Sequence, residues 1–187
     1  MRQRSCYYRR MQKIVDFMFK LIYINNTMKI RIYLDTSVPS AFYDYSKPLR
    51  QLITQKWFEN EAQNFNLFIS VLTIDEIDKL KNLQKRNNIK NLILKYNMNI
   101  VEITDKINEL ANIYISDGAV PESEPEDALH IAAATIYQMD GIASWNFKHI
   151  VSFNPIRKIH EINKKLNYPL LEIGSLELFG GSKYGNV

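Results

Sequence analysis

The sequence predicts an α/β fold, in which a mostly parallel central sheet is flanked by helices. Short apolar segments with strand character alternate with helical patterns along the chain, and this alternation is typical of parallel sheets. The length of 187 residues suits one domain with a full-sized core, and the apolar fraction of 46% is ordinary for a globular protein. No internal repeat or low-complexity tract interrupts the pattern.

The strands are expected where short apolar runs end in polar or turn residues. The first is KIRIYL at 29–34, and the others are NLFISVL at 66–72, MNIVEI at 98–103, IASW after Gly141, and LLEI at 170–173. A loop and a short helix cover Thr36 to Asp44, where Pro39 is acceptable in a first helical turn. Longer helices are expected over 48–62, from Thr73 into KLKNL, over 86–95, 105–116 and 125–138, and from Pro155 to about 166.

Residues 1–27 are expected to be a basic and apolar extension outside the domain. Their segment IVDFMFKLIYI contains Asp16 and Lys20, and no small-residue cleavage site follows it, which disfavours a signal peptide. The extension is either a product of start-site choice or a helical arm. We expect the domain to span 28–179, with a flexible tail at 180–187. Removing the extension should leave stability nearly unchanged, unless its apolar stripe docks on the domain.

Composition narrows the function only weakly. The whole chain has a net charge of +4, of which residues 1–27 contribute +5 and residues 28–187 contribute −1. Because the positive charge is concentrated in this extension, the pI of about 9.0 is weak evidence for a nucleic-acid partner. One cysteine and three histidines without zinc spacing argue against a disulfide framework and a thiolate or zinc site. A reducing, cytoplasmic location is the default, and no run of about 18 uncharged apolar residues is present to span a membrane.

Four polar residues beside the apolar segments carry the functional argument. They are Asp35 in RIYLDTSV, Glu76 in SVLTIDEI, Asp127 in PEDALHIAAA and Asn146 in IASWNFKHI. Unpaired buried carboxylates are costly, and ligands of open α/β sheets bind outside the carboxyl ends of the strands. A cation shared at that edge would remove the repulsion between the carboxylates. Oxygen ligands suit Mg2+ or Mn2+, which points to metal-assisted phosphodiester cleavage.

Each of these residues also has a purely structural explanation. Asp35 and Asn146 could be turn residues, Glu76 could complete a capping box with Thr73, and Asp127 could interact with a helix dipole. Their joint arrangement favours a site, because separate strand ends each supply an oxygen ligand and Asp127 begins a helix that is otherwise apolar on several sides.

Two neighbours of these residues need to be told apart from them. On a helix, Glu76 shares a face with Leu80, whereas Asp75 points elsewhere, so Glu76 is the better candidate. His130 follows Asp127 by one turn and is expected to pack inside the domain rather than to bind a metal. Trp145 is also expected to pack.

The segments IYLDTSV, ISVLTIDEI, EDALHIAAA and SWNFKHIV resemble those of PIN-domain proteins, the fold of VapC-type toxin ribonucleases, over about residues 28–175. The resemblance implies a PIN-like three-layer sandwich and a Mg2+ or Mn2+ ion held by Asp35, Glu76 and Asp127. Asn146 stands where a fourth acid often follows, which leaves the number of metals open. It also implies a metal-dependent endoribonuclease, often the toxin of a pair with a cognate antitoxin. We also expect a homodimer.

Candidate substrate contacts come partly from the resemblance and partly from residues that lie next to the site residues in sequence. Thr36 and Ser37 match small hydroxyl residues that help to hold metal-bound waters. Arg50, with Lys47, and Lys148, with His149, lie near the site residues in sequence and could meet phosphates. Three aromatic residues beside them could stack on bases or could instead pack in the core or at a dimer contact: Phe42, Tyr43 and Tyr45.

Several other classes of protein fit the sequence less well. A phosphatase that begins with an aspartate after its first strand needs a second acid where Ser37 stands. A receiver domain needs an earlier acidic pair, and no phosphate-binding glycine motif is present. The remaining alternative is a non-catalytic PIN module that binds RNA or a protein partner, which the amide at Asn146 keeps open.

Overall fold

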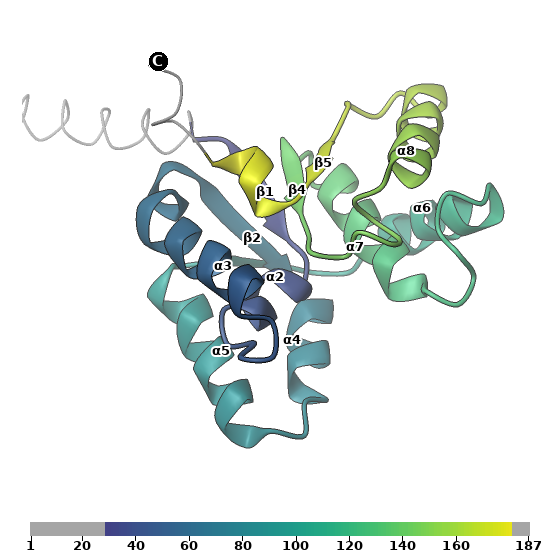
Figure 1. Ribbon diagram of the computed structural model, residues 1–187. Helices are drawn as coiled ribbons and strands as arrows, with labels where there is room; N and C mark the ends of the chain where they lie inside the picture. Colours follow the sequence, from purple (N-terminus) through teal and green to yellow (C-terminus); the bar gives the residue numbers. More distant parts are fainter. Residues whose placement is uncertain (1–28, 181–187) are drawn as a thin grey trace, which may run out of the picture.

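A five-stranded parallel sheet lies at the centre of the computed structural model, which describes residues 29–180 (Figure 1). The strand order is β3-β2-β1-β4-β5, and all four pairings are parallel. The bounds are β1 (Arg31–Leu34), β2 (Asn66–Ser70), β3 (Asn99–Val101), β4 (Gly141–Ala143) and β5 (Glu172–Gly174). The predicted α/β class is confirmed. The expectations for residues 1–27 and for the tail beyond Gly180 lie outside the described residues.

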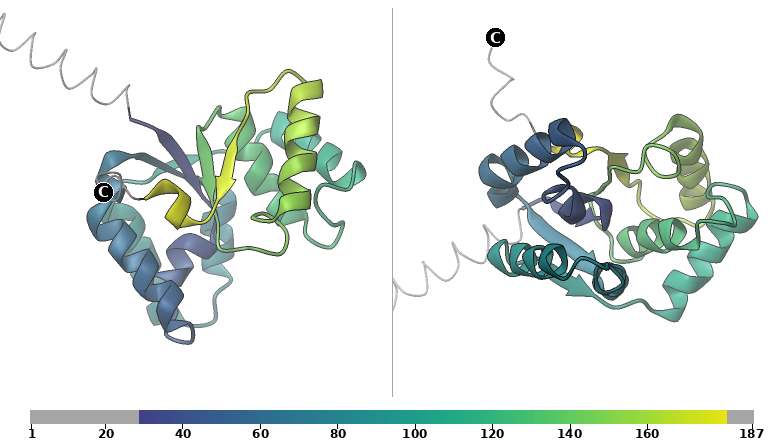
Figure 2. Two further views of the ribbon diagram at one scale, coloured as in Figure 1. Left: turned by 45° about the horizontal axis from the view of Figure 1, so that its top comes forward. Right: turned by 60° about the horizontal axis from the view of Figure 1, so that its bottom comes forward.

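Helices cover both faces of this sheet, as Figures 1 and 2 show. Of the helices within residues 29–180, the first four lie on one face and the last three lie on the other face. The bounds are α2 (Ser37–Ala41), α3 (Pro48–Asn60), α4 (Val71–Asp78), α5 (Leu83–Lys95), α6 (Asp105–Ser116), α7 (Pro125–Ile136) and α8 (Phe153–Lys165), with short 3-10 turns η1 (Ala62–Asn64) and η2 (Leu176–Phe179). The result is a three-layer sandwich. None of the helices within 29–180 is both long and apolar enough to cross a bilayer.

The period-two pattern of β1 divides the core into two layers. Ile32 and Leu34 are fully buried in the layer beneath α2, α3, α4 and α5, whereas Tyr33 is fully buried in the layer beneath α6, α7 and α8. A strand buried on both faces is expected in the middle of a parallel sheet. Because both layers pack against β1, the residue that follows Leu34 has a fixed position.

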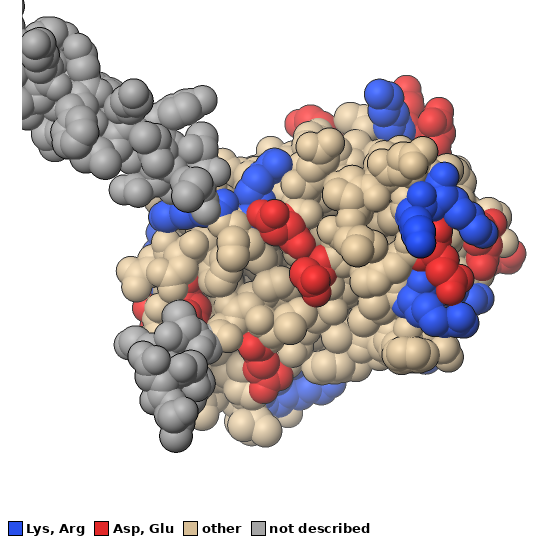
Figure 3. Space-filling view, turned by 90° about the horizontal axis from the view of Figure 1, so that it is seen from above, with Lys and Arg blue, Asp and Glu red and all other residues tan. Residues whose placement is uncertain are grey.

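The register places the carboxyl ends of β1 and β4 together. Leu34 pairs with Ala143, and the backbone N–H of Asp35 donates to the carbonyl of Ala143 at 3.1 Å. The chain segments that follow these strands therefore begin side by side, at the edge where α2, α4 and α7 also start (Figure 1). The amino ends of the strands lie at the opposite edge, on the face shown in Figure 3.

Some element boundaries differ from the expectation. The predicted strand 66–72 is wrong in its last two residues, because the helix α4 begins at Val71 and not at Thr73. Ser70 has extended backbone just before α4, and the Thr73 hydroxyl accepts from the Ser70 N–H at 3.4 Å. Ser70 and Thr73 therefore cap the start of the helix. Likewise α8 begins at Phe153, and Pro155 fits into its first turn, where no helical N–H is required.

Candidate functional site

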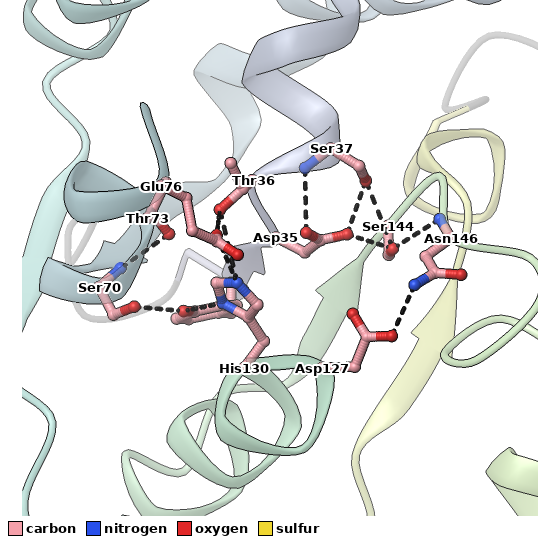
Figure 4. A network of polar contacts seen from close by, with 11 residues as sticks. Asp35, Thr36, Ser37, Ser70, Thr73, Glu76, Asp127, His130, Ser144 and Asn146 are labelled. Atoms are coloured by element: carbon pink, nitrogen blue, oxygen red, sulfur yellow. Dashed lines mark hydrogen bonds and ion pairs between the residues drawn. The ribbon is translucent and has the colours of Figure 1, made fainter. Parts of the chain in front are cut away.

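Asp35 lies at the carboxyl end of β1 and is fixed from two sides (Figure 4). Only 5% of its surface is exposed. Its Oδ1 accepts from the backbone N–H of Ser37 at 3.0 Å, and its Oδ2 accepts from the Ser37 hydroxyl at 2.6 Å and from the Ser144 hydroxyl. The Ser37 hydroxyl also accepts from the backbone N–H of Trp145 at 2.8 Å. The donors come from the start of α2 and from the segment after β4, so the strand register determines the orientation of this carboxylate.

Asp127 reaches the same edge from the first turn of α7. Pro125 begins this helix, and its interior is buried against the sheet. The Asn146 amide donates to Asp127 Oδ2 at 2.7 Å. The Asn146 carbonyl oxygen accepts from the backbone N–H groups of Lys148 and His149 at 3.2 and 3.1 Å, which fixes which atom of the amide faces Asp127. Asn146 therefore acts as a donor that positions the Asp127 carboxyl.

Burial and the charge of Asp35 disfavour the ionised form of Asp127. Burial, and next the negative charge of Asp35, raise the pKa of Asp127 from 3.8 to about 7, although the hydrogen bond from Asn146 works in the opposite direction. A carboxyl that stays partly protonated near neutral pH indicates negative charge that its surroundings do not neutralise. A divalent cation bound to both carboxylates would remove this cost.

Glu76 lies on the other side of Asp35, in the second turn of α4 (Figure 4). Its Oε2 accepts from the Thr36 hydroxyl and lies 3.0 Å from His130 Nε2. Partial burial opposes ionisation of Glu76, but the hydrogen bond from His130 lowers its pKa. Asp75 is exposed, as the helical spacing predicted. Glu76 is therefore ionised and held by two partners in this structure.

His130 is buried between Glu76 and a second polar chain. It is 1% exposed, and its Nδ1 lies 2.7 Å from the Tyr33 hydroxyl, which donates to the Ser70 hydroxyl at 2.7 Å. With Tyr33 donating to Ser70, the Tyr33 oxygen accepts from Nδ1–H, and Nε2–H donates to Glu76. Burial works against this charge, yet the contacts with Tyr33 and Glu76 raise the pKa of His130 well above 6.5. His130 packs inside the domain, as expected, and pairs with a candidate metal ligand.

The candidate residues therefore form two neighbouring groups rather than one. Asp35, Ser37, Asp127 and Asn146 lie together, whereas Thr36 and Glu76 face His130. Within residues 29–180, no three acidic, histidine or cysteine side chains are gathered as a metal site. The oxygen-only donors and the raised pKa of Asp127 nevertheless fit a hard divalent cation beside Asp35 and Asp127.

The candidate phosphate-binding residues have different surroundings. Arg50 forms an ion pair with Asp44 and is partly buried. Lys148 is exposed, and His149 lies 3.5 Å from the carboxylate of Glu124. Lys47 and Lys148 are thus the exposed cations of this set, and Lys148 follows Asn146 by two residues.

The aromatic residues near Arg50 divide between packing and exposure. Phe42 lies 4.9 Å from Tyr43 and 5.7 Å from Phe58 between ring centroids, so Phe42 and Tyr43 belong to the packing around α3. Tyr45 is 79% exposed. Of the three, Tyr45 is available for stacking on a base.

One residue of the site was not found in the sequence. Ser144 is fully buried, donates to Asp35 and accepts from the backbone N–H of Asn146 at 2.9 Å. The signal was present, because Ser144 is the polar residue of the apolar run IASW and stands two residues before Asn146.

Comparisons with known proteins bear on the family and the fold. A family model for the PIN domain matches residues 32–150. The toxin VapC20 from Mycobacterium tuberculosis, which cleaves the sarcin-ricin loop, has a similar structure with a TM-score of 0.52 and 13% sequence identity, over 63% of this chain and 92% of that chain. VapBC2 from Rickettsia felis, solved with a DNA fragment from its promoter, has a TM-score of 0.47 and 14% identity, over 76% of this chain and 98% of that chain. No curated protein matches this chain.

Proposed function

Because this chain belongs to the PIN-domain family, we propose that it is a metal-dependent endoribonuclease that cleaves RNA phosphodiester bonds with activated water. The observation that carries the proposal is the pair of carboxylates at the carboxyl edge of the sheet. Burial and the charge of Asp35 raise the pKa of Asp127 to about 7. Two neighbouring carboxyl groups of which one resists ionisation are suited to binding a cation, because the cation stabilises the ionised form of both.

Asp35, Glu76 and Asp127 are the residues that would hold Mg2+ or Mn2+. When bound, such an ion lowers the pKa of a water ligand and stabilises charge that develops on the phosphoryl oxygens. Ser37 and Ser144 keep both oxygens of Asp35 oriented, and Asn146 does the same for Asp127.

The remaining contacts assign supporting roles. Thr36 and His130 orient the Glu76 carboxylate beside the group formed by Asp35, Ser37, Asp127 and Asn146. Lys148 supplies an exposed cation for an RNA phosphate, and Tyr45 a ring for a base. Arg50 and His149 each lie against a carboxylate, which reduces the positive charge that they offer to phosphates, so RNA affinity should be modest and its salt dependence shallow.

We also propose that the enzyme acts in the cytoplasm as the toxin of a toxin–antitoxin pair and forms a homodimer. The support for a toxin is the shared fold with VapC20, which is a sarcin-ricin loop cleaving toxin. A small protein partner encoded beside this chain would be the antitoxin, and its binding should block cleavage.

A nuclease assay with matched variants tests the proposal. The wild type should cleave structured RNA in Mn2+ or Mg2+ and lose activity in a chelator. Asp127→Asn keeps an acceptor for Asn146 but removes the charge, so cleavage should fall by orders of magnitude with the fold intact. Glu126→Gln removes an exposed acid from the same helical turn and should cleave like wild type. Equal activity of wild type and Asp127→Asn would exclude Asp127 from the site.

A non-catalytic PIN module that binds RNA or protein is the second candidate. Glu76 favours it, because this carboxylate is engaged by Thr36 and His130 rather than grouped with Asp35 and Asp127. In that case RNA would bind without being cleaved in either metal, and Asp127→Asn would not weaken binding.

A further inference from the structure

An apolar pocket opens at the edge of the sheet opposite to the carboxylates. It has a volume of about 660 Å3, and its apolar lining includes Ile30, Phe65, Leu178 and Phe179. Ile30 is 51% exposed and Leu178 is 56% exposed. Apolar side chains this open to water in a concave site are suited to covering by another apolar segment.

The floor of this pocket is well ordered by packing. The Trp57 ring stacks on Phe65 with centroids 5.6 Å apart, and its Nε1 donates to the carbonyl of Phe179 at 3.0 Å. Trp57 itself is 4% exposed. The pocket is therefore a preformed surface, built from η1, β5, η2 and the residues that flank α3, β1, β2 and β4, rather than a gap between loose segments.

The charged residues that line the pocket are all acidic. Three carboxylates line it, from Glu61, Asp140 and Glu172, and none of its lining residues is a lysine or arginine. Asp140 already accepts from the backbone N–H of Arg31 at 2.7 Å. Figure 3 shows acidic side chains across the otherwise largely uncharged middle of this face. An apolar occupant with basic flanks would match both the lining and the charge.

The chain itself supplies such a segment, close in sequence to the pocket residue Ile30. Nine of the eleven residues at 14–24 are apolar, and residues 1–27 carry a net charge of +5. Ile30, which lines the pocket, is six residues beyond the end of this segment. Six residues span up to about 20 Å when extended, which is enough for the segment to return to the pocket. The short link also gives it a high effective concentration there.

We propose that residues 14–24 dock in this pocket of their own chain, with the basic residues at 2–13 beside its carboxylates. Docking removes the exposed apolar surface of both parts from water. The proposal takes the alternative that the apolar stripe docks on the domain, in place of the expectation that removing the extension leaves stability nearly unchanged. It does not depend on the nuclease site at the other edge of the sheet.

The single cysteine of the chain, Cys6, allows a direct test on the full-length protein. A nitroxide on Cys6 shortens the relaxation of nearby amide protons, and reduction of the label gives the reference spectrum. Docking should strongly weaken the backbone amide signals of Ile30, Leu178 and Phe179. The amide signals of Asp35 and Asp127, at the far edge of the sheet, should keep their intensity.

Two variants and a mixing experiment decide between occupants. Glu172→Lys reverses an exposed charge and Leu178→Asp places a charge on the apolar lining, so each should restore the weakened signals in a folded protein. Unchanged weakening in both variants, or none in wild type, would overturn the proposal. In the mixing experiment, one sample carries the nitroxide but no NMR isotope, and the other carries the isotope but no nitroxide. The amide signals of the isotope-enriched protein should keep their intensity in this mixture. Weakening in that mixture would instead assign the pocket to a second copy of the chain.

Discussion

Replacing Asp127 with asparagine should stabilise the metal-free protein while removing its metal site. Asparagine keeps an oxygen that accepts from the Asn146 amide, at the contact that measures 2.7 Å in the native protein. It also removes the charge that burial and Asp35 disfavour. The same change is therefore expected to raise stability and to abolish function, which a residue that is only structural would not do.

The size of the effect follows from the Asp127 carboxyl. Its pKa rises from 3.8 to about 7 in the folded protein. At about 1.4 kcal/mol per pH unit this corresponds to about 4 kcal/mol of lost stability. Asp127 is partly exposed, and solvent screening reduces this value, so we expect a gain of about 1–2 kcal/mol for the variant. That corresponds to a rise in Tm of about 2–8 °C for a protein of this size.

The gain should depend on pH. Because the folded pKa of Asp127 lies above the unfolded value, this carboxyl favours folding most at low pH, and the contribution is lost as the pH rises through about 7. Thermal unfolding in a chelator should therefore separate the variant from wild type more at about pH 8 than at about pH 5. Mn2+ affinity of the wild type should fall about tenfold between pH 8 and pH 6, because binding displaces the proton.

A matched control isolates the cause. Glu126→Gln removes an exposed carboxylate from the same first turn of α7, and its Tm should stay near that of wild type at both pH values. If Asp127→Asn melts at or below the wild-type temperature at about pH 8 while keeping the native fold, Asp127 is not held at a cost, and the argument for a cation beside Asp35 loses its main support.

Three other changes have definite expected outcomes. His130→Asn should lower the free energy of unfolding by about 3 kcal/mol in urea titrations, because it leaves the Glu76 carboxylate without its buried partner, whereas Glu76→Gln should cost less; equal losses would mean that the pair is not ionic. Asn146→Asp should keep or increase Mn2+ affinity in calorimetry and lower the stability of the metal-free protein, and clearly weaker binding would place Asn146 away from the ion. Lys148→Ala should weaken RNA binding and reduce its salt dependence by about one phosphate. Arg50→Ala should have a smaller effect, because the Arg50 side chain already pairs with Asp44. A larger effect of Arg50→Ala would place the RNA path along α3.

The positions at strand ends could be predicted from the sequence because one physical rule places them. An apolar run that is buried on both faces must end at a polar residue, and parallel strands end at the same edge. This reasoning located Asp35 and Asn146 relative to each other. The first turn of α7 could be located because Pro125 begins a helix that is otherwise apolar.

The partners of Glu76 could not be predicted in the same way. Its contacts with Thr36 and His130 join residues that are 40 and 54 positions away in the chain, so they depend on how α4 packs against β1 and α7. Ser144 was missed because one serine in a short apolar run is unremarkable until the register is known. The pairing of Arg50 with Asp44 spans six residues across a loop and has no helical or strand period.

Cleavage of RNA in heavy-oxygen water tests the central claim most directly. If activated water attacks the phosphate, the new terminal phosphate should carry one heavy oxygen, and its formation should require Mn2+ or Mg2+ and disappear in Asp127→Asn. Products that end in a cyclic phosphate without heavy oxygen, formed equally in the presence of a chelator, would show attack by the ribose hydroxyl. That result would contradict a metal-dependent hydrolytic site at Asp35, Glu76 and Asp127.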